Sequence, residues 1–158
     1  MKRLIPILLL AILISGFALR IYDLQDAPLD YHATRQLHSA LIARGMYAEQ
    51  ASAGEIEEWQ RLEAIRQMKL EGIIEPPIME WLASRWYLAV NGTQLWIPRL
   101  LAIIFWLLAA LGIVCVAKDW IGWPGAIGAL IFFLFYPYGV IASRSFQPES
   151  LLLATLIW

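Results

Sequence analysis

The sequence predicts an all-α integral membrane protein, and its composition and apolar runs lead to this fold class. Hydrophobic residues make up 60% of the 158-residue chain, and its mean hydropathy is +0.61. Soluble proteins average about 45–50% apolar residues. The apolar runs approach or reach the roughly 20 residues that a membrane-spanning helix needs. The net charge of −1 gives no bulk attraction to nucleic acid, so membrane lipids are the expected surroundings and no nucleic-acid partner is expected.

The first apolar run predicts a transmembrane span over residues 1–22. Lys2 and Arg3 precede "LIPILLLAILISGFAL". Basic residues before an apolar run favour a cytoplasmic N-terminus. A cleaved signal peptide is the alternative, with Gly16 and Ala18 near a weak cleavage site. We expect a retained span.

Residues 23–96 are predicted to form an outward loop that carries amphipathic juxtamembrane helices. "DYHATRQLHSALIARGMY" predicts a helix that begins after Asp30. In "SAGEIEEWQRLEAIRQMKLEG", Ser52 and Glu55 have capping-box spacing, and Glu57 and Arg61 have i, i+4 spacing. That second helix is expected either on the membrane surface or in solvent. The stripe predicted for the first helix consists of Ala33, Leu37, Ala40, Leu41 and Arg44.

The stretch "EPPIMEWLASRWYLAVNG" predicts an interfacial or re-entrant helix and not a span. Pro76 and Pro77 can begin a helix. Its apolar part is short and carries Glu80 and Arg85. A charge at the bilayer centre costs roughly 2.5–3.5 kcal/mol on insertion scales, so crossing here is unfavourable.

The rest of the chain predicts further spans of a helical bundle. Pro137 is expected to kink the third span. By parity, the corner after the third span faces outward with the long loop. The final apolar segment is shorter than a span, which predicts an N-terminal part of a longer protein. The expected segments are a second span at 97–117, a cytoplasmic turn at 118–123, a third span at 124–142, an outward corner at 143–150 and the start of a fourth span at 151–158.

Three carboxylates on the outward side are candidate functional groups. Asp30, Glu75 and Glu149 each lie near an apolar–polar boundary, an environment that suits a carboxylate to general-base chemistry. A structural role is the alternative for two of them. Asp30 is equally placed to act as a helix N-cap. Glu149 is equally placed as a first-turn acid favoured by the helix dipole.

Three arginines are candidate anion binders, namely Arg35, Arg99 and Arg144. Arg99 lies in the first turn of the second span, so it needs either a partner or access to the interface by snorkelling. His32 and His38 fall on different helix faces, so no metal site is expected from them.

The order of these motifs resembles membrane glycosyltransferases of the GT-C fold. The motifs are an aspartate early in the first outward loop, a "PP" helix, "PRLL" in a span and "SRSFQPE" at a corner. The resemblance is to the protein O-mannosyltransferases, the aminoarabinose transferase of lipid A and RgtA/B/C/D-like bacterial proteins. It covers essentially the whole chain, which would form the N-terminal spans of such a multi-span bundle. The sequence departs from the family in "DYH", which lacks a second acid beside Asp30, and in Glu149, where an aspartate is usual.

The resemblance implies an enzyme of the plasma (inner) membrane whose active face is outward. It implies transfer of a sugar from a polyprenyl-phosphate-linked donor to an acceptor hydroxyl. Asp30 would be the catalytic base, Glu75 and Glu149 acidic partners, and Arg35, Arg99 and Arg144 phosphate ligands. No cofactor is predicted. The alternative is a small non-catalytic membrane subunit or a piece of a transporter, in which the outward carboxylates would tolerate replacement by alanine.

Overall fold

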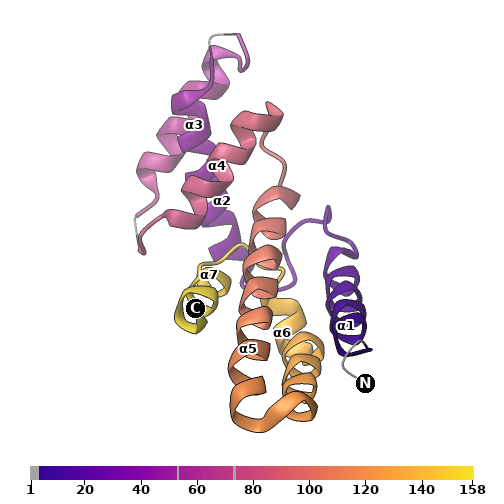
Figure 1. The fold of residues 1–158 in the computed structure, drawn as a ribbon. Helices are drawn as coiled ribbons and strands as arrows, with labels where there is room; N and C mark the ends of the chain where they lie inside the picture. The colour runs from indigo at the N-terminus through magenta and orange to yellow at the C-terminus, as the bar shows by residue number, and fades with distance from the viewer. Residues whose placement is uncertain (1–3, 53, 73) are drawn as a thin grey trace. The chain divides into compact units, whose positions relative to one another are not determined.

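The computed structural model describes residues 4–52, 54–72 and 74–158, and its regular elements are all helices (Figure 1). Helix accounts for 76% of the structure, which confirms the all-α prediction. The chain forms two compact units. Unit 1 combines Met1–Leu24, Ala102–Arg144 and Glu149–Trp158, and unit 2 combines Gln25–Leu101 and Ser145–Pro148. The helices are α1 (Leu4–Ile21), α2 (Ala33–Gln50), α3 (Glu58–Leu70), α4 (Ile78–Val90), α5 (Trp96–Phe135), α6 (Pro137–Ala142) and α7 (Glu149–Ile157).

In unit 1, α1 packs through one narrow stripe and leaves most of its apolar surface exposed. Its buried residues, Ile12, Gly16 and Arg20, follow one another at four-residue intervals. Ile7 and Leu10 remain 65% and 58% exposed. A helix that is apolar on all sides suits a lipid environment. Together with α5, α1 is long and apolar enough to span a membrane, which supports the coarse prediction of membrane association.

Helix α5 is a helical hairpin, because its backbone leaves the helical conformation at Gly122. Gly122 has φ 71° and ψ −179°, a conformation that glycine adopts without the steric cost of a Cβ. Pro124 then begins the returning half, where its missing N–H disrupts no helical hydrogen bond. Gly122 lies inside the turn expected at 118–123. The chain visibly reverses there (Figure 1).

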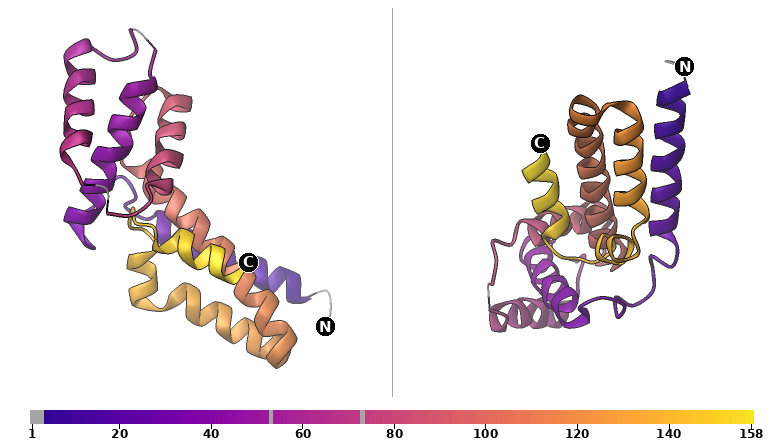
Figure 2. Two further views of the ribbon diagram at one scale, coloured as in Figure 1. Left: turned by 90° about the vertical axis from the view of Figure 1, so that its left-hand side faces the viewer. Right: turned by 90° about the horizontal axis from the view of Figure 1, so that it is seen from below.

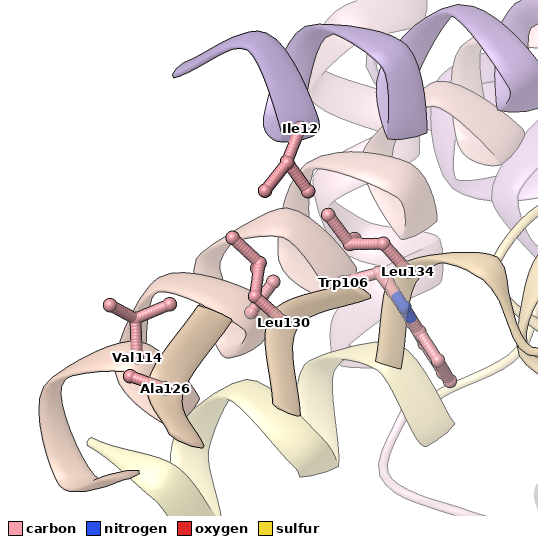
Figure 3. Packing of buried hydrophobic residues seen from close by; sticks show 7 residues of the cluster. Ile12, Trp106, Val114, Ala126, Leu130 and Leu134 are labelled. Atoms are coloured by element: carbon pink, nitrogen blue, oxygen red, sulfur yellow. The ribbon is translucent and has the colours of Figure 1, made fainter. Parts of the chain in front are cut away.

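The two halves of α5 pack against each other and against α1 to form the core of unit 1 (Figure 3). Trp106 stacks on Phe133 with ring centroids 4.6 Å apart. Toward the turn, Val114 and Ala126 belong to the same buried cluster. Along this cluster the residue numbers increase on the outgoing half of α5 and decrease on the returning half, so the two halves are antiparallel. Gly16 allows α1 to pack closely against the returning half of α5, since a Cβ at this position would lie 3.1 Å from Leu134 Cδ1.

The returning half of α5 ends at Phe135 instead of kinking at Pro137. Tyr136 is extended, with φ −62° and ψ 124°, as expected for a residue that precedes proline. Pro137 then begins the short helix α6. The break is therefore sharper than the predicted kink. Further along, α7 lies along the outgoing half of α5, where Trp158 Nε1 donates to the carbonyl of Leu108 over 2.9 Å.

In unit 2, α2 packs against both α3 and α4 (Figure 2). Gly45 allows α3 to approach, because a Cβ at this position would overlap the side chain of Met68. The rings of Tyr47 and Tyr87 meet edge to face between α2 and α4, with centroids 6.1 Å apart. α4 has 13 residues and is therefore about 20 Å long. It is not among the helices long and apolar enough to span a membrane.

Two local expectations for the loop were wrong. The helix expected from Ser52 begins only at Glu58, because the Ser52 N–H donates to Glu55 Oε2 within a turn before the helix. Arg61 Nη2 donates to the carbonyl of Glu49 in α2 over 3.3 Å, instead of pairing along its own helix with Glu57. The carboxylate that does pair within α3 is Glu63, which accepts two hydrogen bonds from Arg66, and these lower the pKa of Glu63.

Candidate functional site

Asp30 and Arg99 form the central pair of the candidate site in unit 2. Arg99 Nη2 lies 3.7 Å from Asp30 Oδ2, and its side chain is only 2% exposed. Arg99 Nη1 donates to the carbonyl of Asp26 over 2.8 Å. This second contact fixes the guanidinium, since a planar fork with two fixed nitrogens has little freedom left. Of the two alternatives for Arg99, a partner or access to the interface by snorkelling, the structure shows the partner.

Asp30 is accessible, although its arginine partner is not. Its side chain is 42% exposed. The residue that caps α2 is His32, in the left-handed conformation with φ 46°, so the alternative that Asp30 is the N-cap is wrong. The loop that ends at Asp30 thus presents a carboxylate to solvent beside a buried, fixed cation. Such a carboxylate can meet a substrate hydroxyl without leaving its partner.

Arg35 and Glu75 form a second ion pair of the same unit. Their side chains are 42% and 39% exposed. The pair borders a small cavity of about 30 Å³, which Glu80 and Pro148 also line. This volume corresponds to about one water molecule. Two predicted site residues, one on α2 and one before the double proline, are therefore brought together by the packing of α4 on α2.

His38 fixes the segment that leads to Glu75. Its Nε2 donates to the carbonyl of Gly72 over 3.0 Å and lies 3.5 Å from Glu71 Oε2. Through these two contacts His38 holds the loop before α4 against α2. Within the described ranges 4–52, 54–72 and 74–158, no three His, Cys, Asp or Glu side chains gather as they would around a metal ion.

Gln36 is a residue of the candidate site that the sequence reasoning missed. Its side chain is 1% exposed. Its Oε1 accepts a hydrogen bond from the Phe146 N–H over 3.0 Å, and its Nε2 donates to the carbonyl of Tyr31. A buried side-chain amide that bridges two backbone groups holds both in place. Gln36 therefore joins the corner residues Ser145–Pro148 to the beginning of α2, where Asp30 and Arg35 lie.

The local sequence pattern indicates only in part that Gln36 is a buried, hydrogen-bonded residue. A glutamine on a helix face with Ser39 and Ala43 is polar enough to suggest a buried hydrogen bond, and all three are buried. Its partner, however, lies 110 residues further along the chain. No helical period relates Gln36 to Phe146. Contacts over such a sequence separation follow from packing and not from local pattern.

Arg144 and Glu149 belong to unit 1, unlike the other predicted site residues. Arg144 Nη2 donates to the carbonyl of Tyr22 over 2.5 Å, at the end of the first helix. Glu149 is the first residue of α7, as the structural alternative predicted. The corner predicted at 143–150 is thus divided between the two units, since Arg144 and Glu149 belong to unit 1 and Ser145–Pro148 to unit 2.

The site can supply an exposed carboxylate, a fixed arginine and an exchangeable arginine. Asp30 can accept a proton or a hydrogen bond. Arg35 can exchange Glu75 for an anionic ligand, because exposed ion pairs contribute only about 0–1 kcal/mol. Arg99 is held by the protein and orients Asp30. Comparisons with family models, curated proteins and solved structures give no match to this sequence.

Proposed function

We propose that this chain is the N-terminal part of a GT-C-type membrane glycosyltransferase that uses a polyprenyl-phosphate-linked sugar. The acceptor is a hydroxyl on the outer face of the plasma membrane. The proposal rests on the motif order of the sequence. The structural observation that supports it is the exposed Asp30 carboxylate beside the buried and fixed Arg99.

In this mechanism Asp30 removes the proton from the acceptor hydroxyl as its oxygen attacks the anomeric carbon. The bond from that carbon to the lipid phosphate breaks, and the phosphate leaves with the electron pair. General-base catalysis of this kind contributes about 10²–10⁴ in rate. A base must be both reachable and oriented. The 42% exposure of Asp30 and its contact with Arg99 meet these two needs.

The arginines have different roles in this proposal. Arg99 is a positioning residue, because it is buried and already engaged by Asp26 and Asp30. Arg35 is the better phosphate ligand, since it is 42% exposed and its partner Glu75 can be displaced. Guanidinium groups match phosphate oxygens in a bidentate geometry. Arg144 is proposed as a further phosphate ligand on the sequence resemblance alone.

The topology belongs to the same proposal. The N-terminus is cytoplasmic, α1 crosses outward, and the residues from α2 to α4 lie on the outer side. The two halves of the α5 hairpin cross inward and outward again. Support comes from the basic N-terminal residues Lys2 and Arg3, which lie outside the described residues, and from the reversal at Gly122.

The test is sugar transfer by the full-length protein in membranes, with Asp30→Asn compared to Asp26→Asn. Both changes remove one carboxylate from the same loop, and the Asp26 backbone carbonyl that holds Arg99 remains in the control. We expect Asp30→Asn to lower kcat at least about 10²-fold, while Asp26→Asn stays near wild type. Equal activity of Asp30→Asn and wild type would exclude the base assignment. Absence of sugar transfer by the wild-type protein would favour the non-catalytic subunit as the alternative.

A further inference from the structure

Unit 2 contains two adjoining cavities that the proposed reaction does not use. The larger has a volume of about 440 Å³ and is lined mainly by the apolar side chains of Leu37, Leu41 and Leu95. The smaller has a volume of about 190 Å³ and is lined mainly by polar groups. Arg44 and Thr93 line both cavities. The two cavities therefore adjoin at Arg44 and Thr93, with an apolar cavity on one side and a polar cavity on the other.

Within the part of the chain that the structure describes, no acidic side chain pairs with Arg44, the cation that lines both cavities. Arg44 is half-buried and forms no hydrogen bond or ion pair with any residue in 4–52, 54–72 or 74–158. The pKa of Glu63 is lowered first by the hydrogen bond from Arg66 and least by the charge of Arg44. A guanidinium in this position is available to an anionic group of a ligand.

The apolar end is closed by a tyrosine that stays neutral. Tyr87 is 1% exposed, and burial raises the pKa of its phenol. The rest of the wall comes from the predicted stripe of α2, of which Leu37, Leu41 and Arg44 line the cavity. A volume of about 440 Å³ falls in the usual range for small-molecule sites, about 300–1,000 Å³. An alkyl chain suits this lining.

The polar end carries both signs of charge. Glu55 lines the smaller cavity together with Arg44. One oxygen of Glu55 accepts the Ser52 N–H over 3.0 Å, and an ionised carboxylate has about four acceptor positions. Glu55 also contributes, after burial, to the raised pKa of Tyr47, so its negative charge acts within this cavity. A purely anionic head group would meet Arg44 and be repelled by Glu55, whereas a zwitterionic head group is complementary to both.

We propose that these cavities bind a zwitterionic phospholipid whose head group ends in an ammonium. The acyl chain occupies the larger cavity, the phosphodiester binds Arg44 and Thr93, and the ammonium binds Glu55. The site is lined by α2, α3, α4 and the segments that follow α2 and α4, and none of its lining residues is a member of the Asp30–Arg99 or Arg35–Glu75 pairs. The inference therefore stands independently of the proposed sugar transfer.

The test measures equilibrium binding of two lysophospholipids with the same acyl chain to the purified chain in detergent. One carries an ethanolamine head group and the other a glycerol head group. We expect the wild type to bind the ethanolamine lipid at least about threefold more tightly, the effect of one partly exposed ion pair. Glu55→Gln should remove this preference and leave binding of the glycerol lipid unchanged or tighter. Arg44→Gln should weaken binding of both lipids.

Two controls keep the result specific. Glu57→Gln changes an exposed glutamate of the same loop that does not line the cavity, and it should retain the preference. Leu41→Trp fills the larger cavity and should abolish binding of both lipids, while Leu62→Trp on the exposed face of α3 should not. Equal binding of the two lipids by wild type, or an unchanged preference in Glu55→Gln, would overturn the head-group assignment. Unchanged binding in Leu41→Trp would overturn the cavity assignment. Binding of a polyprenyl phosphate more tightly than either lysophospholipid would overturn the phospholipid as the ligand.

Discussion

Arg20 Nε donates a hydrogen bond over 2.7 Å to Ser143 Oγ and thereby joins two helix ends 123 residues apart in the chain. The Arg20 side chain is completely buried, and Nη1 also donates to the carbonyl of Gly16. Trp106 lies under the guanidinium, with its ring centroid 6.0 Å from Cζ. A buried cation of this kind depends on every polar contact it has, because the surrounding helices are apolar.

Ser143→Ala is therefore expected to destabilise unit 1 by about 1–3 kcal/mol, the cost of leaving a buried donor unpaired. The control is Ser15→Ala, since Ser15 is exposed and its hydroxyl bonds only to the carbonyl of Ala11 in its own helix. Denaturant unfolding of the detergent-solubilised protein measures both. Equal stability of the two variants would mean that the Arg20–Ser143 bond contributes nothing to the fold.

Gly45→Ala is expected to loosen the packing of α3 on α2. A Cβ at Gly45 would overlap Met68, so one helix must move. Overpacking of this kind costs about 1–3 kcal/mol. Gly72→Ala is the matched control in the same unit, where a Cβ meets nothing within 4 Å. The measurement is the unfolding midpoint of each variant, and a Gly45→Ala midpoint at or above that of Gly72→Ala would contradict the close approach of the two helices.

The stability of unit 2 should fall with rising pH above about 10 because of Tyr87. Burial raises the pKa of Tyr87, whereas a tyrosine in the unfolded chain loses its proton near about pH 10. Above that pH the unfolded state binds fewer protons than the folded state, so the unfolding free energy decreases as pH rises. The slope from one proton is at most about 1.4 kcal/mol per pH unit. Tyr87→Phe should reduce the slope, and identical slopes would place Tyr87 in solvent.

Replacing the two arginines of the candidate site should separate binding from catalysis. Arg35→Gln is expected to raise KM for the lipid-linked donor with little change in kcat, because Arg35 is exposed and is the proposed phosphate ligand. Arg99→Gln should lower kcat, because Asp30 loses its orientation. A change of about tenfold in either constant corresponds to about 1.4 kcal/mol. Arg85→Gln is the control, since Arg85 stacks on Trp81 at the surface of α4. A lower kcat in Arg35→Gln together with a higher KM in Arg99→Gln would make Arg99 the phosphate ligand and Arg35 the positioning residue.

The proposed topology predicts which cysteines react from outside. In a Cys115→Ala background, Glu57→Cys should be labelled in intact cells by a membrane-impermeant maleimide. Asp119→Cys, beside the reversal of α5, should be labelled only after the membrane is opened. Both side chains are exposed, so accessibility depends on the side of the membrane. Labelling of both in intact cells, or of neither, would refute the assignment of opposite sides.

Local features of the fold could be predicted because they depend on neighbours in sequence. The apolar run of α1, the helix after Asp30 and the reversal near Gly122 are all matters of composition and backbone chemistry. The beginning of α3 was misplaced because Ser52 and Glu55 make the same contact in a turn that they would make in a helix. A spacing rule does not distinguish the two.

The candidate site was predictable in its residue types but only partly in its pairs. Arg99 requires a partner because it is buried, yet sequence spacing does not name Asp30 as that partner. The Arg35–Glu75 pair depends on how α4 packs against α2. Gln36 was missed because one of its two partners is Phe146, which no local period connects to it.

The division of the corner between two units has a consequence for synthesis on the ribosome. Unit 2 takes Ser145–Pro148 from a stretch that is flanked on both sides by residues of unit 1. When Leu101 has just been translated, α2, α3 and α4 can exist as helices. The N–H of Phe146, which donates to Gln36 Oε1 in the folded chain, has not yet been synthesised at that stage. Gln36 Oε1 therefore stays without this hydrogen bond until the whole α5 hairpin has been synthesised. The start of α2 thus gains its last backbone partner only after the later helices have been synthesised, and the final form of unit 2 depends on a residue that comes late in the chain.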